Sequence, residues 1–159
     1  MNFADTNWLE ALYFESPEAE QQGREEVVQR FMRKHGGQLA ISHFVYLEAR
    51  NVFSRTAKEA EPEEWRRFVA DFGGLIYLDP MNWDSVRREA FELFGRYAPR
   101  VTVGTLDMAI LASARLSGAT RLLSFDETLK AVAVAERLDV FPALSAAGKA
   151  VSRRAQGRV

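Results

Sequence analysis

Four acidic residues far apart in the sequence occupy positions from which they can act together. Asp5 follows the short apolar segment 2–4, and Asp126 lies two residues after a second such segment. Asp107 is near the start of a stretch rich in Ala and Leu, and Glu48 is about two turns into an amphipathic stretch. In a parallel α/β sheet, ligand-binding groups gather beyond the carboxyl ends of the strands. We therefore expect Asp5, Glu48, Asp107 and Asp126 to converge at that edge.

A cluster of four carboxylates favours metal-dependent phosphodiester chemistry. Like charges in a partly desolvated cleft raise one another's pKa values, and a bound divalent cation offsets that repulsion. Hard oxygen ligands select Mg²⁺ or Mn²⁺. Such an ion polarises a phosphodiester and activates water, so neither histidine nor cysteine is needed. The chain has no cysteine, and its two histidines, His35 and His43, are not spaced as a metal-binding pair.

Each of these acids also has a simpler interpretation. An aspartate after a strand often forms a turn or caps a helix, as Asp5 and Asp126 would. Asp107 would complement a helix dipole, and Glu48 would lie on a solvated helix face. The four positions taken together favour a site. Three arginines on helices expected near it are candidates to hold phosphate or to be solvated: Arg50, Arg55 and Arg115.

Short apolar runs alternate with longer amphipathic segments, which is typical of βαβ units around a parallel sheet. The candidate strands are Asn2–Ala4, Leu39–Ile41, Leu75–Leu78, Arg121–Ser124 and Val140–Phe141. The expected helices are 7–14, capped by Asn7; a second capped by Ser16 and ending at His35; one capped by Ser42; 62–72; 83–97; and one capped by Thr105 and ending near Ser117. This alternation of strands and helices predicts a single α/β domain.

Composition limits the class of protein and suggests where the domain ends. With 159 residues, 47% hydrophobic and 27% charged, the chain is long enough for one globular domain with a packed core. We expect that domain to span residues 1–144. Residues 145–159 carry basic side chains and no acid, and we expect a flexible tail there, with RNA contact as the alternative.

The net charge and the hydropathy of the sequence exclude some further classes of protein. A net charge of −1 gives no overall attraction to a polyanion. The N-terminal segment has no basic region of the kind that opens a secretory signal, and no apolar run reaches membrane-spanning length. We therefore expect a cytoplasmic protein without a membrane partner.

The acidic positions, in their order and spacing, resemble the four motifs of PIN-domain proteins, and most closely those of VapC-type toxins. The matching segments are Phe3-Ala4-Asp5-Thr6-Asn7, Ser42 with Glu48, Thr105-Leu106-Asp107-Met108-Ala109-Ile110-Leu111-Ala112 and Ser124-Phe125-Asp126. The resemblance implies a three-layer α/β/α domain with a central parallel sheet of about five strands. It also implies a Mg²⁺- or Mn²⁺-dependent endoribonuclease, homodimers and a cognate antitoxin protein.

The same resemblance assigns roles to individual residues. Asp5, Glu48, Asp107 and Asp126 become the catalytic acids that bind metal and position water, and Thr6 and Ser124 support them. A PIN-fold RNA-binding or regulatory module without turnover is the main alternative. A phosphatase-like enzyme is a weaker one, because Asp5-Thr6-Asn7 lacks the second aspartate of aspartyl phosphotransfer motifs. An apolar stripe is open to two interpretations, core or partner surface: Trp8, Leu12, Tyr13 and Phe14.

Overall fold

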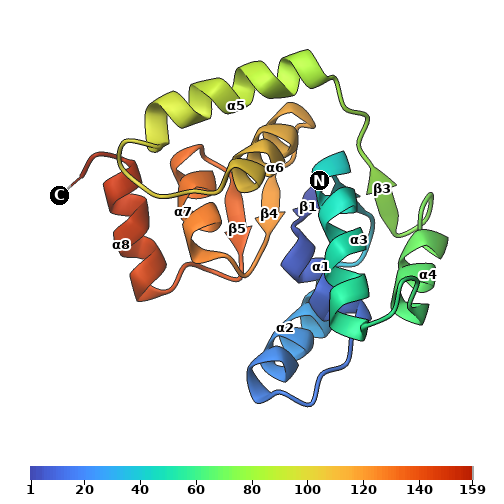
Figure 1. Cartoon of the computed structure of the whole chain (residues 1–159). Helices are drawn as coiled ribbons and strands as arrows, with labels where there is room; N and C mark the ends of the chain where they lie inside the picture. The colour runs from blue at the N-terminus through green and yellow to red at the C-terminus, as the bar shows by residue number, and fades with distance from the viewer. Residues whose placement is uncertain (159) are drawn as a thin grey trace.

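The computed structural model of the chain describes residues 1–158 and contains a five-stranded sheet in the order β3-β2-β1-β4-β5, with every pairing parallel (Figure 1). The strands are β1 (Asn2–Ala4), β2 (Leu39–Ile41), β3 (Ile76–Leu78), β4 (Arg121–Leu123) and β5 (Asp139–Phe141). β1 lies at the centre, where Phe3 pairs with Ala40 on one side and Leu122 on the other. The predicted α/β class and parallel sheet are confirmed.

Helices connect the strands and form the outer layers of the domain. From β1 the chain proceeds through β2 to β3 in one direction, and β4 and β5 extend the sheet in the other. Because parallel crossovers are right-handed, the two directions place helices on opposite faces. The helices are α1 (Thr6–Tyr13), α2 (Ala19–His35), α3 (His43–Ala57), α4 (Glu63–Ala70), α5 (Trp83–Tyr97), α6 (Thr105–Leu116), α7 (Glu127–Ala135) and α8 (Ala146–Ala155).

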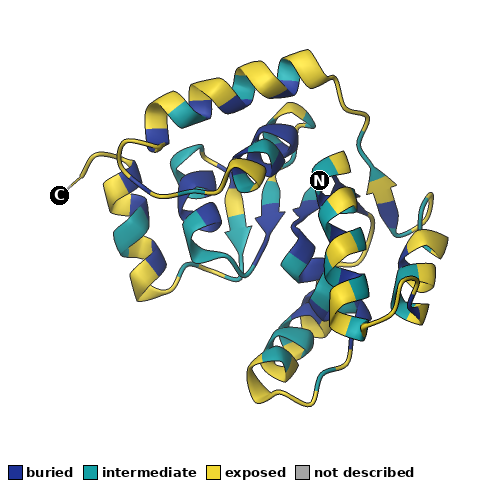
Figure 2. Cartoon of the chain, viewed as in Figure 1, coloured by how far each residue is buried: buried dark blue, intermediate teal, exposed yellow. Residues whose placement is uncertain are grey.

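The core lies on the sheet and on the helix faces that cover it. The inner strands are buried, whereas the outer helices expose one side (Figure 2). α4, in the additional helical stretch expected at 62–72, packs through aromatic rings onto α3. Phe68 is fully buried, with its ring centroid 5.5 Å from those of both Tyr13 and Phe53. Trp65 stacks on Tyr46 at 5.5 Å, which extends this cluster toward the surface.

Several helix starts differ from the predicted ones. Asp5, rather than Asn7, caps α1, because its carboxylate accepts a hydrogen bond from the Thr6 amide. α2 begins at Ala19 instead of directly after Ser16, whose hydroxyl accepts from the Glu18 amide in the preceding turn. Gly104 is the N-cap of α6, and Thr105 is its first residue. Ser42 caps α3 as predicted, accepting from the Val45 amide at 3.1 Å.

The basic segment after residue 144 is not the flexible tail that the sequence predicts. Residues 146–155 form α8, which packs alongside α7 (Figure 1). Ser145 caps it, and its buried face consists of small residues, Gly148, Ser152 and Ala155. Small side chains let the two helices approach closely, while the arginines of α8 remain on its outer side. Among residues 1–158, no helix is long and apolar enough to cross a membrane.

Candidate active site

Asp5 lies at the carboxyl end of the central strand, in the interior of the cluster. Its side chain is only 4% exposed. One carboxylate oxygen accepts from the Thr6 amide at 2.8 Å, and the other accepts from the Ser124 hydroxyl at 2.7 Å. Asp5 therefore both caps α1 and connects β1 to the turn after β4. Ser124 therefore contacts Asp5 directly.

Glu48 reaches the site from α3, because the helix after β2 carries its carboxylate back toward β1. The Thr6 hydroxyl donates a hydrogen bond to a Glu48 carboxylate oxygen. Thr6 is buried and Glu48 is partly buried. The contact fixes the direction of Glu48 at the edge of the sheet. Thr6 therefore connects the start of α1 to Glu48 on α3.

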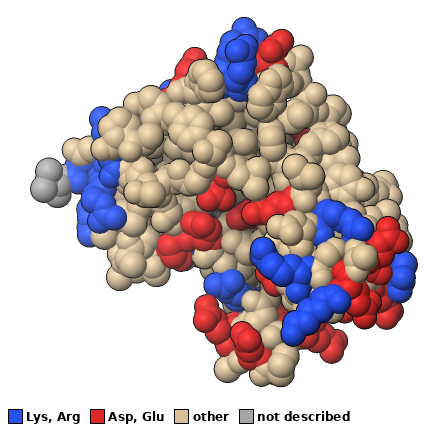
Figure 3. Space-filling model, viewed as in Figure 1, with Lys and Arg blue, Asp and Glu red and all other residues tan. Residues whose placement is uncertain are grey.

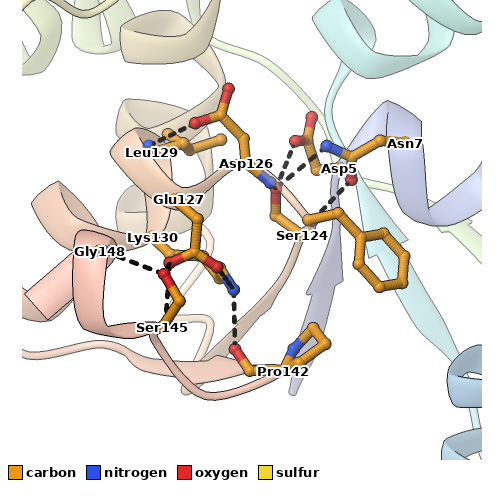
Figure 4. A network of polar contacts seen from close by, with 11 residues as sticks. Asp5, Asn7, Ser124, Asp126, Glu127, Leu129, Lys130, Pro142, Ser145 and Gly148 are labelled. Atoms are coloured by element: carbon orange, nitrogen blue, oxygen red, sulfur yellow. Dashed lines mark hydrogen bonds and ion pairs between the residues drawn. The ribbon is translucent and has the colours of Figure 1, made fainter. Parts of the chain in front are cut away.

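A small hydrogen-bonded turn carries the fourth acid (Figure 4). The Ser124 hydroxyl accepts from the Asp126 amide at 3.0 Å and from the Asn7 side chain at 3.4 Å. The Asn7 amide oxygen in turn accepts from the Phe125 amide at 3.0 Å. Asp126 caps α7 by accepting from the Leu129 amide at 2.8 Å. Asp126 is therefore both a helix cap and a member of the acidic cluster.

Asp107 completes the set from the first turn of α6, where it is partly buried. Its pKa is raised to about 6, mainly by burial and in addition by the nearby charges of Asp126 and Glu48. A side chain at Gly104 would crowd it, since a Cβ there would lie 3.1 Å from the Asp107 carboxylate. The Asp107 pKa shift thus shows electrostatic contact with acids from two other segments.

The pKa of Asp5 is raised from 3.8 to about 7. Burial is the largest cause, the hydrogen bonds from Ser124 and Thr6 act in the opposite direction, and the charges of Glu48 and Asp107 raise the pKa again. Charge interactions therefore link Asp5 to Glu48 and Asp107, and Asp107 to Glu48 and Asp126. Figure 3 shows acidic side chains gathered in the hollow at the middle of the molecular face, with lysines and arginines over α2 and α3 beside them.

The donor set fits a divalent cation by its chemistry. All four groups are carboxylates, the oxygen ligands that Mg²⁺ and Mn²⁺ prefer, and their mutual repulsion is what a doubly charged ion would relieve. In the part of the chain that the structure describes, no group of three or more acids or histidines already has the geometry of a metal site. Ion binding would therefore require the carboxylates to turn toward one another.

Two of the three candidate arginines are engaged elsewhere. Arg50 bonds to the Ala60 carbonyl and lies over the ring of Trp65. Arg115 pairs with Glu89 and, at 2.7 Å, with Glu136. Arg55 is exposed on α3. The phosphate-holding role is therefore not supported for Arg50 or Arg115.

Asn7, which the sequence predicts as a helix cap, also holds the turn that carries Asp126. Its side chain holds both Ser124 and Phe125, so it joins α1 to the turn that carries Asp126. The sequence signal for a site role of Asn7 is its position two residues after Asp5. In the apolar stripe, Trp8, Tyr13 and Phe14 belong to the core, and Leu12 is partly buried against it.

Comparison with known proteins agrees with this geometry. The sequence model of the PIN domain matches residues 3–135. The chain belongs to the PIN domain family. That family consists of nucleases, which generally use divalent metal ions. A search of curated protein sequences finds no significant match.

Solved structures with the same fold include VapC-type proteins. One is the toxin VapC20 of Mycobacterium tuberculosis, which is described as cleaving the sarcin-ricin loop. Its TM-score is 0.65 and its sequence identity is 19%, and the match covers 82% of this chain and 94% of the VapC20 chain. VapBC2 of Rickettsia felis, bound to a promoter DNA fragment, has a TM-score of 0.60 and 14% sequence identity, and the match covers 87% of this chain and 96% of that chain. FitAcB of Neisseria gonorrhoeae has a TM-score of 0.58 and 16% sequence identity, and the match covers 89% of this chain and 96% of that chain.

Proposed function

We propose that this PIN-domain protein is a Mg²⁺- or Mn²⁺-dependent endoribonuclease that acts as the toxin of a toxin–antitoxin pair. The observation that carries the proposal is the convergence of Asp5, Glu48, Asp107 and Asp126 from four distant segments, with the pKa values of Asp5 and Asp107 raised. A structured RNA is the substrate class, in line with the activity named for the VapC20 relative.

Each residue has a defined part in this activity. When bound by these carboxylates, a divalent ion would supply polarisation of the scissile phosphate and a more nucleophilic water. Asp5 and Asp107, whose pKa values are raised, would supply two of the ligand carboxylates. Glu48, which accepts from Thr6, and Asp126, which caps α7, would supply the other two. Ser124 orients Asp5 and keeps the turn after β4 in place.

The direct test measures cleavage of a structured RNA with added Mn²⁺ or Mg²⁺. Asp5→Asn and Asp107→Asn should each lower the cleavage rate by at least about 100-fold, because each removes a charged ligand that the metal needs. Asp139→Asn is the matched control. Asp139 is exposed and lies at the amino end of β5, whereas the candidate site lies beyond the carboxyl ends of the strands. Unchanged cleavage by both site variants would refute the assignment. RNA binding without metal-dependent products from the unaltered protein would instead favour a binding module.

An antitoxin segment is the proposed protein partner, and two adjoining surface hollows offer it a place. Both are lined by Phe14, Glu15 and Ser16 at the α1–α2 connection. One continues over Glu63 and Glu64 of α4, and the other over basic residues of α2. If a small neighbouring reading frame encodes the partner, its co-expression should restore growth. Reversing the charges of Glu63 and Glu64 to lysine should weaken that rescue while leaving cleavage unchanged.

A homodimer is the proposed assembly, and one apolar surface suits it. Leu47 on α3 is 70% exposed and Trp83 on α5 is 56% exposed. Phe44 joins them, with its ring centroid 6.2 Å from that of Trp83. Burying such side chains against a second copy would remove apolar area from water. Leu47→Glu and Trp83→Glu should convert a dimer into a monomer in light scattering, and an unchanged mass would exclude this surface as the interface.

A further inference from the structure

A partly buried polar junction connects α8 to α7 (Figure 4). At its centre is Lys130, which is only 1% exposed. Its ammonium group donates to a Glu127 carboxylate oxygen at 2.8 Å and to the Pro142 carbonyl at 3.0 Å. A buried charge is tolerated only when it is paired and hydrogen-bonded. The Lys130 side chain therefore holds the first turn of α7 to the segment that follows β5.

Glu127 extends the junction to the start of α8. Its second carboxylate oxygen accepts from both the amide and the hydroxyl of Ser145, each at 3.1 Å. The Ser145 hydroxyl also caps α8 by accepting from the Gly148 amide at 3.1 Å. A Cβ on Gly148 would lie 2.0 Å from that Glu127 oxygen. Glycine is therefore required for Glu127 to occupy this position.

The junction is adjacent in the chain to the fourth acid of the candidate site. Asp126 immediately precedes Glu127 and caps the helix that Glu127 begins. On its other side, the Asp126 amide donates to Ser124, which donates to Asp5. The backbone of Asp126 is thus held between the site and the junction. α8 lies beyond residues 3–135, where the PIN match ends.

We propose that Glu127, Lys130 and Ser145 are positioning residues, which use α8 to hold the first turn of α7 so that Asp126 faces Asp107 in the metal site. The inference rests on the proposed function, because it assumes that Asp126 serves that site. It assigns a role to a helix outside the PIN match. Without the junction, the first turn of α7 would lose its hydrogen bonds to the segment after β5 and to the start of α8.

The test measures the affinity of the full chain for Mn²⁺ alone by calorimetry, together with its melting temperature. Lys130→Met removes the central cation at nearly constant volume, and Gly148→Ala displaces the Glu127 carboxylate without changing charge. Each should weaken Mn²⁺ binding roughly tenfold, as loss of a group that orients a ligand does. Lys149→Met is the matched control, because Lys149 is exposed on α8, and it should leave the affinity unchanged.

A double-mutant cycle separates positioning of Asp126 from a general loss of structure. Lys130→Met should weaken Mn²⁺ binding in the unaltered chain and in Asp107→Asn, but have no further effect in Asp126→Asn. Asparagine still caps a helix, so Asp126→Asn preserves the start of α7. Gly148→Ala supplies the same comparison if Lys130→Met does not fold.

Two results would overturn the inference while leaving the proposed function intact. The first is unchanged Mn²⁺ affinity in both junction variants, and the second is an equal loss in the Asp126→Asn background. Failure of the proposed function has a different signature. Asp5→Asn, Asp107→Asn and Asp126→Asn would then all bind Mn²⁺ as tightly as the unaltered chain, and the junction would have no metal site to serve.

Discussion

At the scale of single residues, the surroundings of Asp5 act in opposite directions on the ionisation of its carboxyl group. Its carboxylate caps α1 and accepts from Ser124, and both contacts favour the charged form. Burial and the charges of Glu48 and Asp107 favour the neutral form, and they dominate. The folded chain therefore contains a carboxyl group that is costly to ionise in the absence of a cation. Such groups are common at functional sites, where chemistry rather than stability determines the residue.

The stability of the metal-free protein should consequently fall as the pH rises from about 4 to about 7. Asp5 and Asp107 have raised pKa values in the folded state, so the folded state binds protons more tightly than the unfolded state in this range. At pH 8, Asp5→Asn should raise the free energy of unfolding by up to about 4 kcal/mol, at 1.36 kcal/mol per pKa unit. Urea denaturation with EDTA at pH 5 and pH 8 measures both effects. A larger gain at pH 5 than at pH 8 would contradict the explanation.

Binding of Mn²⁺ should release protons near pH 6.5, because ligand carboxylates must be ionised. Titration calorimetry in buffers with different ionisation enthalpies counts those protons. The number should decline toward zero by pH 8, where Asp5 and Asp107 are already ionised. Asp5→Asn should reduce the count at pH 6.5, whereas Asp139→Asn should not. A proton count that does not depend on pH would show that these carboxyls are not the ones binding the ion.

At the scale of elements, the cluster around α4 holds the additional helix to the domain. Phe68 contacts rings from three other segments, and it has no exposed surface. Phe68→Ala should therefore lower the free energy of unfolding by about 3–5 kcal/mol through lost contacts and the cavity left behind. Phe91→Ala is the matched control, because Phe91 is 67% exposed, and it should cost less than about 1 kcal/mol. Equal losses in chemical denaturation would contradict this packing.

The strands could be predicted from the sequence because each is a short apolar run bounded by turn-forming residues. The structure places Asn2–Ala4 and Leu39–Ile41 at the predicted positions, and the other three strands agree within one residue at an end. Helix caps were less predictable. A side chain such as that of Asp5 or Asn7 can bond to its own helix or to a distant segment, and only tertiary structure decides which.

α8 shows why another element was missed. Its buried residues are Gly148, Ser152 and Ala155, so it lacks the stripe of large aliphatic side chains that marks an amphipathic helix in a sequence. Its contact with α7 depends on close approach and on the Lys130–Glu127 pair, which no local pattern reveals. The acids of the site were predictable because each follows a recognisable strand or helix start. The contacts that Asn7 and Lys130 make were not predictable, because their partners include Phe125 and Pro142 in other segments.

At the scale of the whole molecule, the acidic cluster should weaken RNA binding to the metal-free protein. The net charge of the chain is only −1, but on the proposed function a phosphate has to approach the four carboxylates. Local repulsion should therefore matter more than net charge. The same surface should become attractive to a phosphate once a divalent ion neutralises part of it.

The combined change Asp5→Asn and Asp107→Asn should strengthen RNA binding several-fold in EDTA at pH 8 and low salt. Asp84→Asn with Asp139→Asn is the control, because it alters the net charge by the same amount at exposed positions away from the site. Fluorescence anisotropy with a cleavage-resistant RNA measures both pairs. Equal gains would show that overall charge, rather than the hollow, governs affinity, and both gains should shrink as salt is added.

The central position of β1 has a consequence for the order of events during synthesis. Asp5 is made 119 residues before Ser124, whose hydroxyl orients it, and the neighbour strand β4 is nearly as late as Ser124. A growing chain attached to the ribosome therefore cannot complete the acidic cluster until Asp126 has been translated. On the proposed function, the nuclease should stay inactive until then, beside the RNA-rich machine that makes it.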